Sequence, residues 1–223
     1  MKKRQSNRIS IKMKVILIIL LIPVAVTLFT LTAIIWTGLK NPELIRKSAN
    51  ALLDMQEKQS GTTIPEDYIP IYKEAAEAYG IPWTLLAAHH RIETRFSTMD
   101  SLLSPAGAEG HMQFMPCTFV GWSYPGCGGL GKGKIPKHDK TNPEVIKKYG
   151  GYGVDANGDG IADPFDLEDA MHSAAKYLAK SGAADGDIEK AIFKYNHSEK
   201  YVQDVLGFFD EFEAYRIETE TAH

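Results

Sequence analysis

Glu93 is a residue whose type and position in the sequence could support acid catalysis. It follows the apolar run at 85–88 and begins the segment Glu-Thr-Arg-Phe at 93–96. A carboxyl at the edge of a hydrophobic core has a raised pKa, because burial disfavours its charged form. Such a group suits general acid catalysis near neutral pH. On residue type alone, a solvated glutamate that closes its helix and pairs with Arg95 is the simpler interpretation.

Residues 104–116 combine small side chains with one amide. They read Ser-Pro-Ala-Gly-Ala-Glu-Gly-His-Met-Gln-Phe-Met-Pro. Small residues let the backbone pass close to a ligand or to another part of the chain. The amide of Gln113 can both donate and accept hydrogen bonds, as a sugar ligand would require. Without further information, a tight loop packed on the core explains this segment more simply.

Residues 194–198, Lys-Tyr-Asn-His-Ser, stand at the junction of two predicted helices. At such a junction the side chains of Tyr195 and Asn196 can point into a cleft. Capping of the helix ends by Asn196 and Ser198 is the alternative, and it needs no ligand.

Residues 155–166 carry oxygen atoms at the spacing of a calcium-binding loop. An EF-hand loop places side-chain oxygens at positions 1, 3, 5, 9 and 12, and glycine at position 6. Here position 12 is an aspartate, which reaches less far than the usual glutamate, and the hydrophobic residue stands at position 7. A turn held by aspartate side chains is the alternative. The candidate ligands of a structural calcium ion are Asp155, Asn157, Asp159, Ile161, Asp163 and Asp166.

The adjacent His89 and His90 do not form a zinc motif, because no His-Glu-x-x-His segment is present. Zinc sites need further ligands at metal-binding spacing. We therefore expect one of these histidines to be packed and the other exposed, and no cofactor to be required for catalysis.

The elements that position these segments are predicted to be helices. Apolar residues recur at helical spacing in 67–79, and Gly80 ends that helix while Pro82 opens the next. Residues 97–111 and 121–140 are predicted to be irregular. No alternating strand pattern occurs, so the predicted fold class is mainly α. Further helices are expected at 142 onward, 166–178, 187–195 and 198 to about 215.

Composition and charge exclude several classes of protein. The 223 residues are 44% hydrophobic and 24% charged, which is ordinary for a folded chain and excludes a disordered or collagen-like one. The first fourteen residues carry six Lys or Arg and no acidic residue. The remainder carries 19 Lys and Arg against 28 Asp and Glu. Because phosphate binding needs clustered basic residues, nucleic acid is not expected as a partner.

The N-terminal part predicts a membrane anchor. Residues 15–39 contain no charged residue; as a helix they would span roughly 37 Å, enough for a hydrocarbon core of about 30 Å. The basic segment 1–14 would stay in the cytoplasm, so the domain would face outward. A cleaved signal peptide is the alternative. The expected organisation continues with a stalk at 40–63, a folded domain at 64–217 and a tail at 218–223.

Cys117 and Cys127 are the only cysteines of the sequence. On the outward side of a membrane, a disulfide between them is the natural prediction. Two unpaired thiols would be expected if the domain stayed in a reducing compartment.

Taken together and in this order, the first three segments resemble the lytic transglycosylase family of the lysozyme-like superfamily. The family pattern is Glu-Ser/Thr-x-Phe at a helix end, then Ser-x-Ala-Gly-Ala-x-Gly-x-Met-Gln-x-Met-Pro, then Tyr-Asn. The matching residues are 93–96, 104–116 and 195–196, and 163–164 and 169–178 are also similar. The resemblance covers about 70–217 and implies a lysozyme-like, goose-type (SLT) helical domain. Thr94 replaces the commoner serine, and the segment 121–140 has no counterpart.

The resemblance implies a peptidoglycan substrate, cut at the β-1,4 bond between N-acetylmuramic acid and N-acetylglucosamine. Glu93 would protonate the leaving oxygen and then take the proton of the sugar's own 6-hydroxyl, closing a 1,6-anhydro ring. Gln113 and Asn196 would hold N-acetyl or hydroxyl groups, and Tyr195 would orient the catalytic carboxyl. The implied substrate-binding residues are Ser104, Gly110, Met112, Gln113, Phe114, Tyr195 and Asn196.

Two rival functions remain open on the sequence. A muramidase would cut the same bond with water, and Glu109 and Asp100 are near enough in sequence to supply a second carboxylate. A glycan-binding or assembly protein would keep the fold without turnover. The anchor predicts local cutting at the outer face of the membrane of a single-membrane bacterium, with peptidoglycan and an envelope-spanning secretion or conjugation machine as expected partners.

Overall fold

The protein is described by a computed structural model that covers residues 63–221 together with 28–30, 32, 36, 43, 46 and 47. The chain divides into two compact units, residues 1–59 and 60–223. Among the described residues, no helix is both long and apolar enough to cross a membrane. Most of the predicted anchor at 15–39 and of the stalk at 40–63 lies outside the described residues, so both stay predictions.

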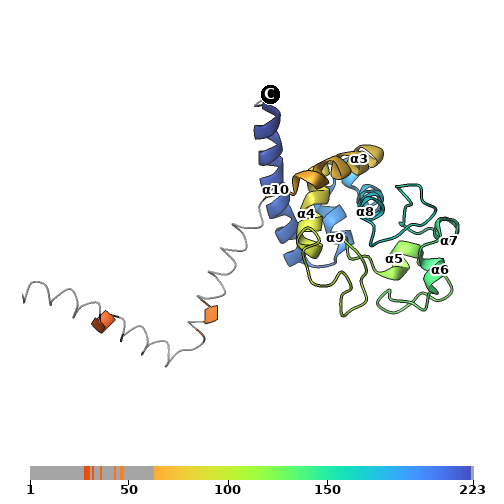
Figure 1. Ribbon diagram of the computed structural model, residues 1–223, viewed down its shortest axis with the longest axis horizontal. Helices are drawn as coiled ribbons and strands as arrows, with labels where there is room; N and C mark the ends of the chain where they lie inside the picture. The colour runs from red at the N-terminus through yellow and green to blue at the C-terminus, as the bar shows by residue number, and fades with distance from the viewer. Residues whose placement is uncertain are drawn as a thin grey trace, which may run out of the picture. The chain divides into compact units, whose positions relative to one another are not determined.

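The described part of the second unit is built from helices, which confirms the mainly α fold class (Figure 1). Its only β pairing consists of two isolated bridges, from Glu109 to Leu103 and to Phe114. The helical elements are η1 (Glu66–Tyr68), α3 (Ile69–Tyr79), α4 (Trp83–Thr94), α5 (Pro116–Val120), α6 (Lys137–Lys140), α7 (Pro143–Tyr149), α8 (Leu167–Ser181), η2 (Ala183–Asp185), α9 (Ile188–Tyr195) and α10 (Glu199–Thr221).

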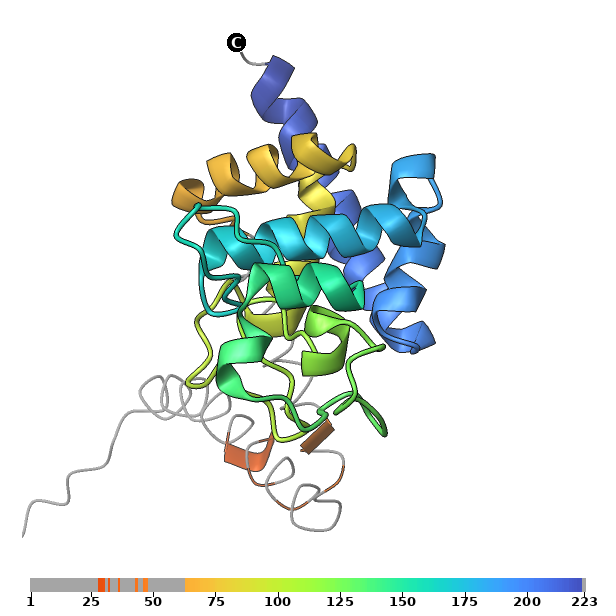
Figure 2. The same cartoon turned by 90° about the vertical axis from the view of Figure 1, so that its right-hand side faces the viewer.

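Helix α4 is the central element of this unit. It contacts α10, α3 and α8, and nine of its twelve residues are buried. Figure 2 shows α3 and α8 crossing in front of it, with α10 behind. A helix enclosed on several sides has no wide polar face. The predicted division of His89 and His90 into one packed and one exposed residue is therefore wrong, because both have no exposed surface.

Several helix ends lie where the sequence places them. Gly80 ends α3 in the left-handed conformation, with φ of 67°, and Asn142 and Asp166 cap α7 and α8 with side-chain oxygens that accept two backbone N–H groups each. The structure differs from the predicted tail at 218–223, because α10 continues to Thr221. Arg216 binds Glu213 and Glu220 one turn away on either side, and such pairs support an exposed helix.

A disulfide joins Cys117 to Cys127, at the start of the irregular stretch 121–140, and confirms the predicted pairing. Glycines are needed here because the chain passes close to itself. A Cβ atom on Gly126 would lie 2.2 Å from the carbonyl oxygen of Lys134, and one on Gly133 would lie 2.8 Å from the sulfur of Cys117. The short helix α6 lies at the end of this stretch, where no helix was expected.

Candidate active site

Glu93 lies in the last turn of α4, where its helix leaves the core. Its carboxyl accepts a hydrogen bond from the hydroxyl of Tyr201, at 2.5 Å between the oxygen and Oε1. Burial raises the pKa of Glu93 to about 7, although the hydrogen bond from Tyr201 acts in the opposite direction. Both the protonated and the ionised carboxyl are therefore populated near neutral pH, as a group that gives and then takes a proton requires.

Aromatic rings enclose this carboxyl. The ring of His89, one helical turn before Glu93, lies 5.0 Å from the ring of Tyr195 and 6.0 Å from that of Tyr201. The Nδ1 atom of His89 faces the carbonyl of Leu85 at 2.9 Å and must donate its proton there, because a carbonyl only accepts. Burial lowers the pKa of His89 to about 4. The imidazole is therefore neutral and offers Glu93 no compensating charge.

The segment 104–116 forms a tight loop whose polar side chains hold its own shape. The hydroxyl of Ser104 accepts a hydrogen bond from the backbone N–H of Ala108, at 2.9 Å. The Nε2 atom of Gln113 donates to the carbonyls of Leu102 and Gly110, at 3.0 and 2.9 Å. Gln113 itself adopts a positive φ of 49°. In this structure Ser104 and Gln113, two predicted substrate-binding residues, stabilise the backbone of the loop.

Three further residues of the predicted substrate-binding set serve the packing of this loop. The side chains of Met112 and Phe114 are buried, with exposed fractions of 0% and 3%, so only their backbone can face a ligand. Their predicted part in substrate binding stays a prediction. Gly110 has a φ of 81°, and a Cβ atom there would lie 1.8 Å from the carbonyl oxygen of Pro164. The loop therefore needs glycine in order to pack.

The third segment meets the other two through Tyr195, at the end of α9. Its hydroxyl donates to the carbonyl of Met112, at 2.8 Å, and so ties the loop to the helix junction beside Glu93. Tyr201, and not Tyr195, donates to the carboxyl of Glu93, and the orienting role of Tyr195 stays a prediction. Asn196 is exposed at the end of α9, beside this junction.

Glu109, which could have supplied a second carboxylate, is engaged elsewhere. Its Oε1 atom forms an ion pair with the ammonium of Lys140, at 2.5 Å, and both side chains are largely buried. The pair joins the loop to the end of α6. Asp100, the other acidic residue near in sequence, is exposed.

The predicted calcium loop is held by hydrogen bonds of its own side chains. Asp155 accepts from the N–H groups of Gly158 and Gly160, and Asp166 is occupied as the cap of α8. Asn157, Asp159 and Asp163 each accept from the N–H two residues ahead. In the described ranges, no three His, Cys, Asp or Glu side chains lie close enough together to hold a metal ion. In this arrangement the candidate ligands do not converge on one point, and calcium binding stays a prediction.

Sequence reasoning missed two residues of this region. Tyr201 is a buried residue of α10, and nothing in its spacing distinguishes it from an ordinary core tyrosine. Asp169 on α8 has no exposed surface and accepts from the N–H groups of Ala156 and Asp163, at 2.7 and 2.8 Å. An aspartate at an inward-facing position of a helix was the available signal. Asp169 joins the loop at 155–166 to α8.

The site is thus a half-buried carboxylic acid at a helix end, near two tyrosines and a tight loop. No family model matches the chain. A curated protein named L-Ala--D-Glu endopeptidase, from Bacillus subtilis (strain 168), is 28% identical over 146 residues. The match covers 65% of this chain and 41% of that protein, so this chain spans less than half the length of its relative.

Among solved structures, the Escherichia coli lytic transglycosylase SLT35 in complex with bulgecin A matches the chain. The TM-score is 0.49 and the sequence identity 16%, and the match covers 71% of this chain and 74% of that one. A similarity of this extent assigns neither a family nor a function, which must be argued from the site.

Proposed function

We propose that this chain is a peptidoglycan lytic transglycosylase that cuts the β-1,4 bond between N-acetylmuramic acid and N-acetylglucosamine. One observation carries the proposal. Glu93 is a carboxylic acid with a pKa raised to about 7 by burial, and it lies where the three motifs meet. A single acid with both protonation states available fits a reaction in which one residue works twice.

In the first step, protonated Glu93 gives its proton to the glycosidic oxygen, and the bond from that oxygen to C1 of the muramic sugar breaks. In the second step, ionised Glu93 takes the proton of the same sugar's 6-hydroxyl, whose oxygen bonds to C1. The ring closes, no water is consumed, and Glu93 is again protonated. Tyr201 holds Oε1 through its hydrogen bond, so the carboxyl keeps one orientation in both steps.

The ion pair of Glu109 supports this single-carboxylate route over hydrolysis. Hydrolytic glycosidases commonly place two carboxylates on opposite sides of the bond, one of them to activate water or to attack the sugar. Glu109 is bound to Lys140 and serves the loop. A muramidase, which uses water as the attacking group, remains the rival for the same bond.

The cellular setting follows from the sequence and is part of the proposal. With residues 15–39 as an anchor, the domain acts on the wall from the outer face of the cell membrane. The disulfide between Cys117 and Cys127 suits such an oxidising location. Local cutting of this kind would open the wall for growth or for an envelope-spanning machine.

The test is digestion of purified peptidoglycan by the full chain in mild detergent, with Glu93→Gln as the inactive comparison. Mass spectra of the released fragments should show products lighter by one water and without a reducing end. Reducing-end products would replace the transglycosylase with a muramidase. Cleavage of L-Ala–D-Glu bonds alone, the activity in the name of the Bacillus relative, would overturn the proposal, as would equal activity of Glu93→Gln.

A further inference from the structure

Three consecutive residues after α4 adopt a backbone conformation that residues with side chains avoid. Arg95, Phe96 and Ser97 have φ values of 53°, 57° and 64°. Residues other than glycine visit this left-handed region mostly one at a time, because Cβ crowds the following carbonyl. A run of three persists only where the surrounding structure holds it. This left-handed turn, residues 95–97, begins two residues after Glu93.

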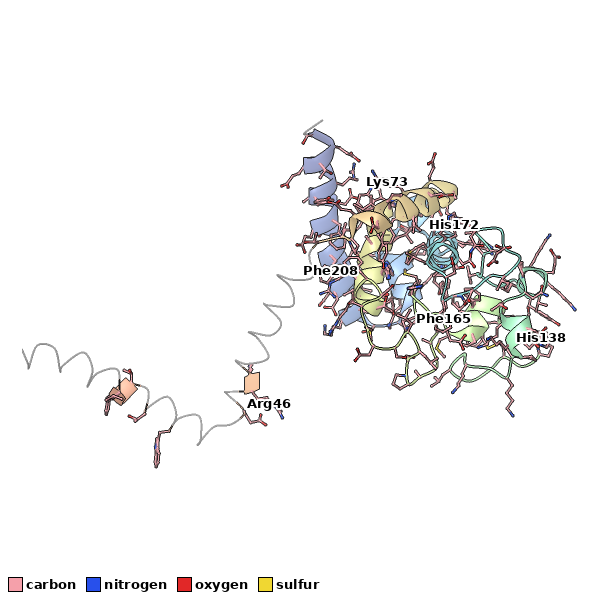
Figure 3. The ribbon with its side chains drawn as sticks, viewed as in Figure 1. Arg46, Lys73, His138, Phe165, His172 and Phe208 are labelled. Carbon is pink, nitrogen blue, oxygen red and sulfur yellow. A yellow bond between two sulfur atoms is a disulfide. The ribbon has the colours of Figure 1, made fainter. Side chains whose placement is uncertain are left out.

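The hydroxyl of Ser97 is held between two imidazoles. Its oxygen lies 2.6 Å from Nε2 of His90 and 2.5 Å from Nδ1 of His111. On one side, Nδ1 of His90 meets the hydroxyl of Tyr72 at 2.6 Å. On the other, Nε2 of His111 meets the carbonyl of Phe165 at 2.9 Å (Phe165 is labelled in Figure 3). Four hydrogen bonds thus run from α3 through α4 to the loop before α8.

The donors and acceptors in this series of hydrogen bonds follow from the bond between His111 and the carbonyl of Phe165. The carbonyl of Phe165 only accepts, so Nε2 of His111 carries the proton and its Nδ1 accepts from Ser97. The Ser97 oxygen is then free to accept from Nε2 of His90, whose Nδ1 accepts from Tyr72. With both imidazoles neutral, every hydrogen in this series points the same way. Burial lowers the pKa of His90 to about 3 and also lowers that of His111, which agrees with this arrangement.

Further contacts fix the turn to its neighbours. The hydroxyl of Thr94, next to Glu93, donates to the carbonyl of His111 at 2.8 Å and accepts from the N–H of Ser97 at 3.2 Å. The ring of Phe96 is buried, with its centroid 5.7 Å from that of His90. The end of α4 therefore cannot shift without breaking bonds to the loop at 104–116.

We propose that Ser97 and His111 are positioning residues for Glu93, acting through the left-handed turn. The proposal rests on the function proposed for Glu93. Without the Ser97 hydroxyl, the turn loses the contact that joins both imidazoles and is no longer held in a single conformation. The last turn of α4 then loosens, water reaches the carboxyl, and the pKa of Glu93 falls towards its usual value.

The test compares Ser97→Ala and Ser97→Gly with Thr98→Ala in the full chain. Glycine accepts a positive φ without strain, so Ser97→Gly keeps the fold while it removes the hydroxyl. Thr98 lies beside the turn and is exposed, and its hydroxyl donates to the carbonyl of Arg95. We expect both Ser97 variants to lower kcat by about tenfold with little change in KM, and Thr98→Ala to leave both unchanged.

Two readouts are independent of turnover. Carbon-13 titration of the Glu93 carboxyl should show its pKa about one unit lower in both Ser97 variants. Nitrogen-15 spectra at pH 7 should show His90 and His111 protonated at Nε2, and His89 at Nδ1. A loss of thermal stability with the Glu93 pKa unchanged, or an Nδ1-protonated His111, would overturn the proposal. If the chain cuts no glycan, the proposed function fails, yet the carboxyl titration still decides the role of Ser97.

Discussion

At the scale of single residues, Glu93 and Tyr201 are the contact on which the chemistry depends. Burial alone would keep the carboxyl protonated, while the phenol hydrogen bond stabilises its ionised form. Burial has the larger effect, because the pKa is raised to about 7 despite the 2.5 Å hydrogen bond. The two effects together leave the carboxyl able to act as both acid and base.

Replacing Tyr201 by phenylalanine should move the pH dependence of cutting. The activity of a general acid falls as pH rises through its pKa, so kcat/KM should decline above about pH 7. Without the hydrogen bond the ionised form is less stable, and the decline should begin about one pH unit higher. Tyr195→Phe is the comparison, because its hydroxyl donates to Met112. An equal shift in both variants would contradict the assignment of Tyr201.

Gly110 tests the packing of the loop under the site. In Gly110→Ala, the new Cβ would collide with the carbonyl group of Pro164, whose backbone atoms cannot rotate aside as a flexible side chain could. We expect a loss of about 4 kcal/mol in the free energy of unfolding, measured by urea denaturation. Gly128→Ala should change it by less than about 0.5 kcal/mol, because nothing lies within 4 Å of a Cβ atom there.

At the scale of elements, α8 holds the loop that supports the site. Asp169 accepts two backbone N–H groups of this loop, from Ala156 and Asp163, and Ser173 accepts that of Val154. Asp169→Ala leaves two N–H groups without their acceptor and should cost about 3 kcal/mol. The melting temperature should fall clearly below that of Glu168→Ala, an exposed neighbour. Equal melting temperatures would show that the loop does not depend on Asp169.

The calcium prediction also belongs to this element. If the loop at 155–166 binds calcium, the carboxylates that now accept backbone N–H groups must also turn their remaining lone pairs towards the ion. Millimolar calcium should then raise the melting temperature, by mass action on the folded state. Asp159→Asn should reduce that increase, and magnesium should not reproduce it. An unchanged melting temperature would show that the loop does not bind calcium.

For the molecule as a whole, buried histidines should make folding sensitive to acid. Burial lowers the pKa of His89 to about 4 and of His90 to about 3, from 6.5. Their contribution is complete above pH 6.5 and is lost as pH falls below it, because only the unfolded chain then binds their protons. Glu93 acts oppositely, since its raised pKa makes the folded chain bind a proton more readily between pH 4.5 and 7.

The measurable consequence is a difference in slope. In the wild-type chain, the free energy of unfolding, measured by urea denaturation, should decrease from pH 6 to pH 4.5. In Glu93→Gln the opposing proton is absent, so the decrease should be steeper by about 1.4 kcal/mol per pH unit. Equal slopes in the two proteins would mean that Glu93 titrates normally, and the acid role argued for it would fail with that result.

The helical class and many helix ends were predictable from the sequence, because these depend on local chemistry. Gly80 ends α3 in a left-handed conformation, and Asn142 and Asp166 cap their helices with side-chain oxygens. The pairing of the two cysteines was predictable from their number and setting. Glu93 could be named as the candidate acid because its motif is contiguous.

The tertiary structure alone decided which groups surround that acid. Tyr201 stands 108 residues after Glu93, and no local pattern reports a contact over that distance. Burial of both His89 and His90 follows from the enclosure of α4 by three helices. Two roles within the loop at 104–116 likewise depend on the neighbours that folding brings to it. Gln113 supports the backbone of the loop, and Met112 packs in the core.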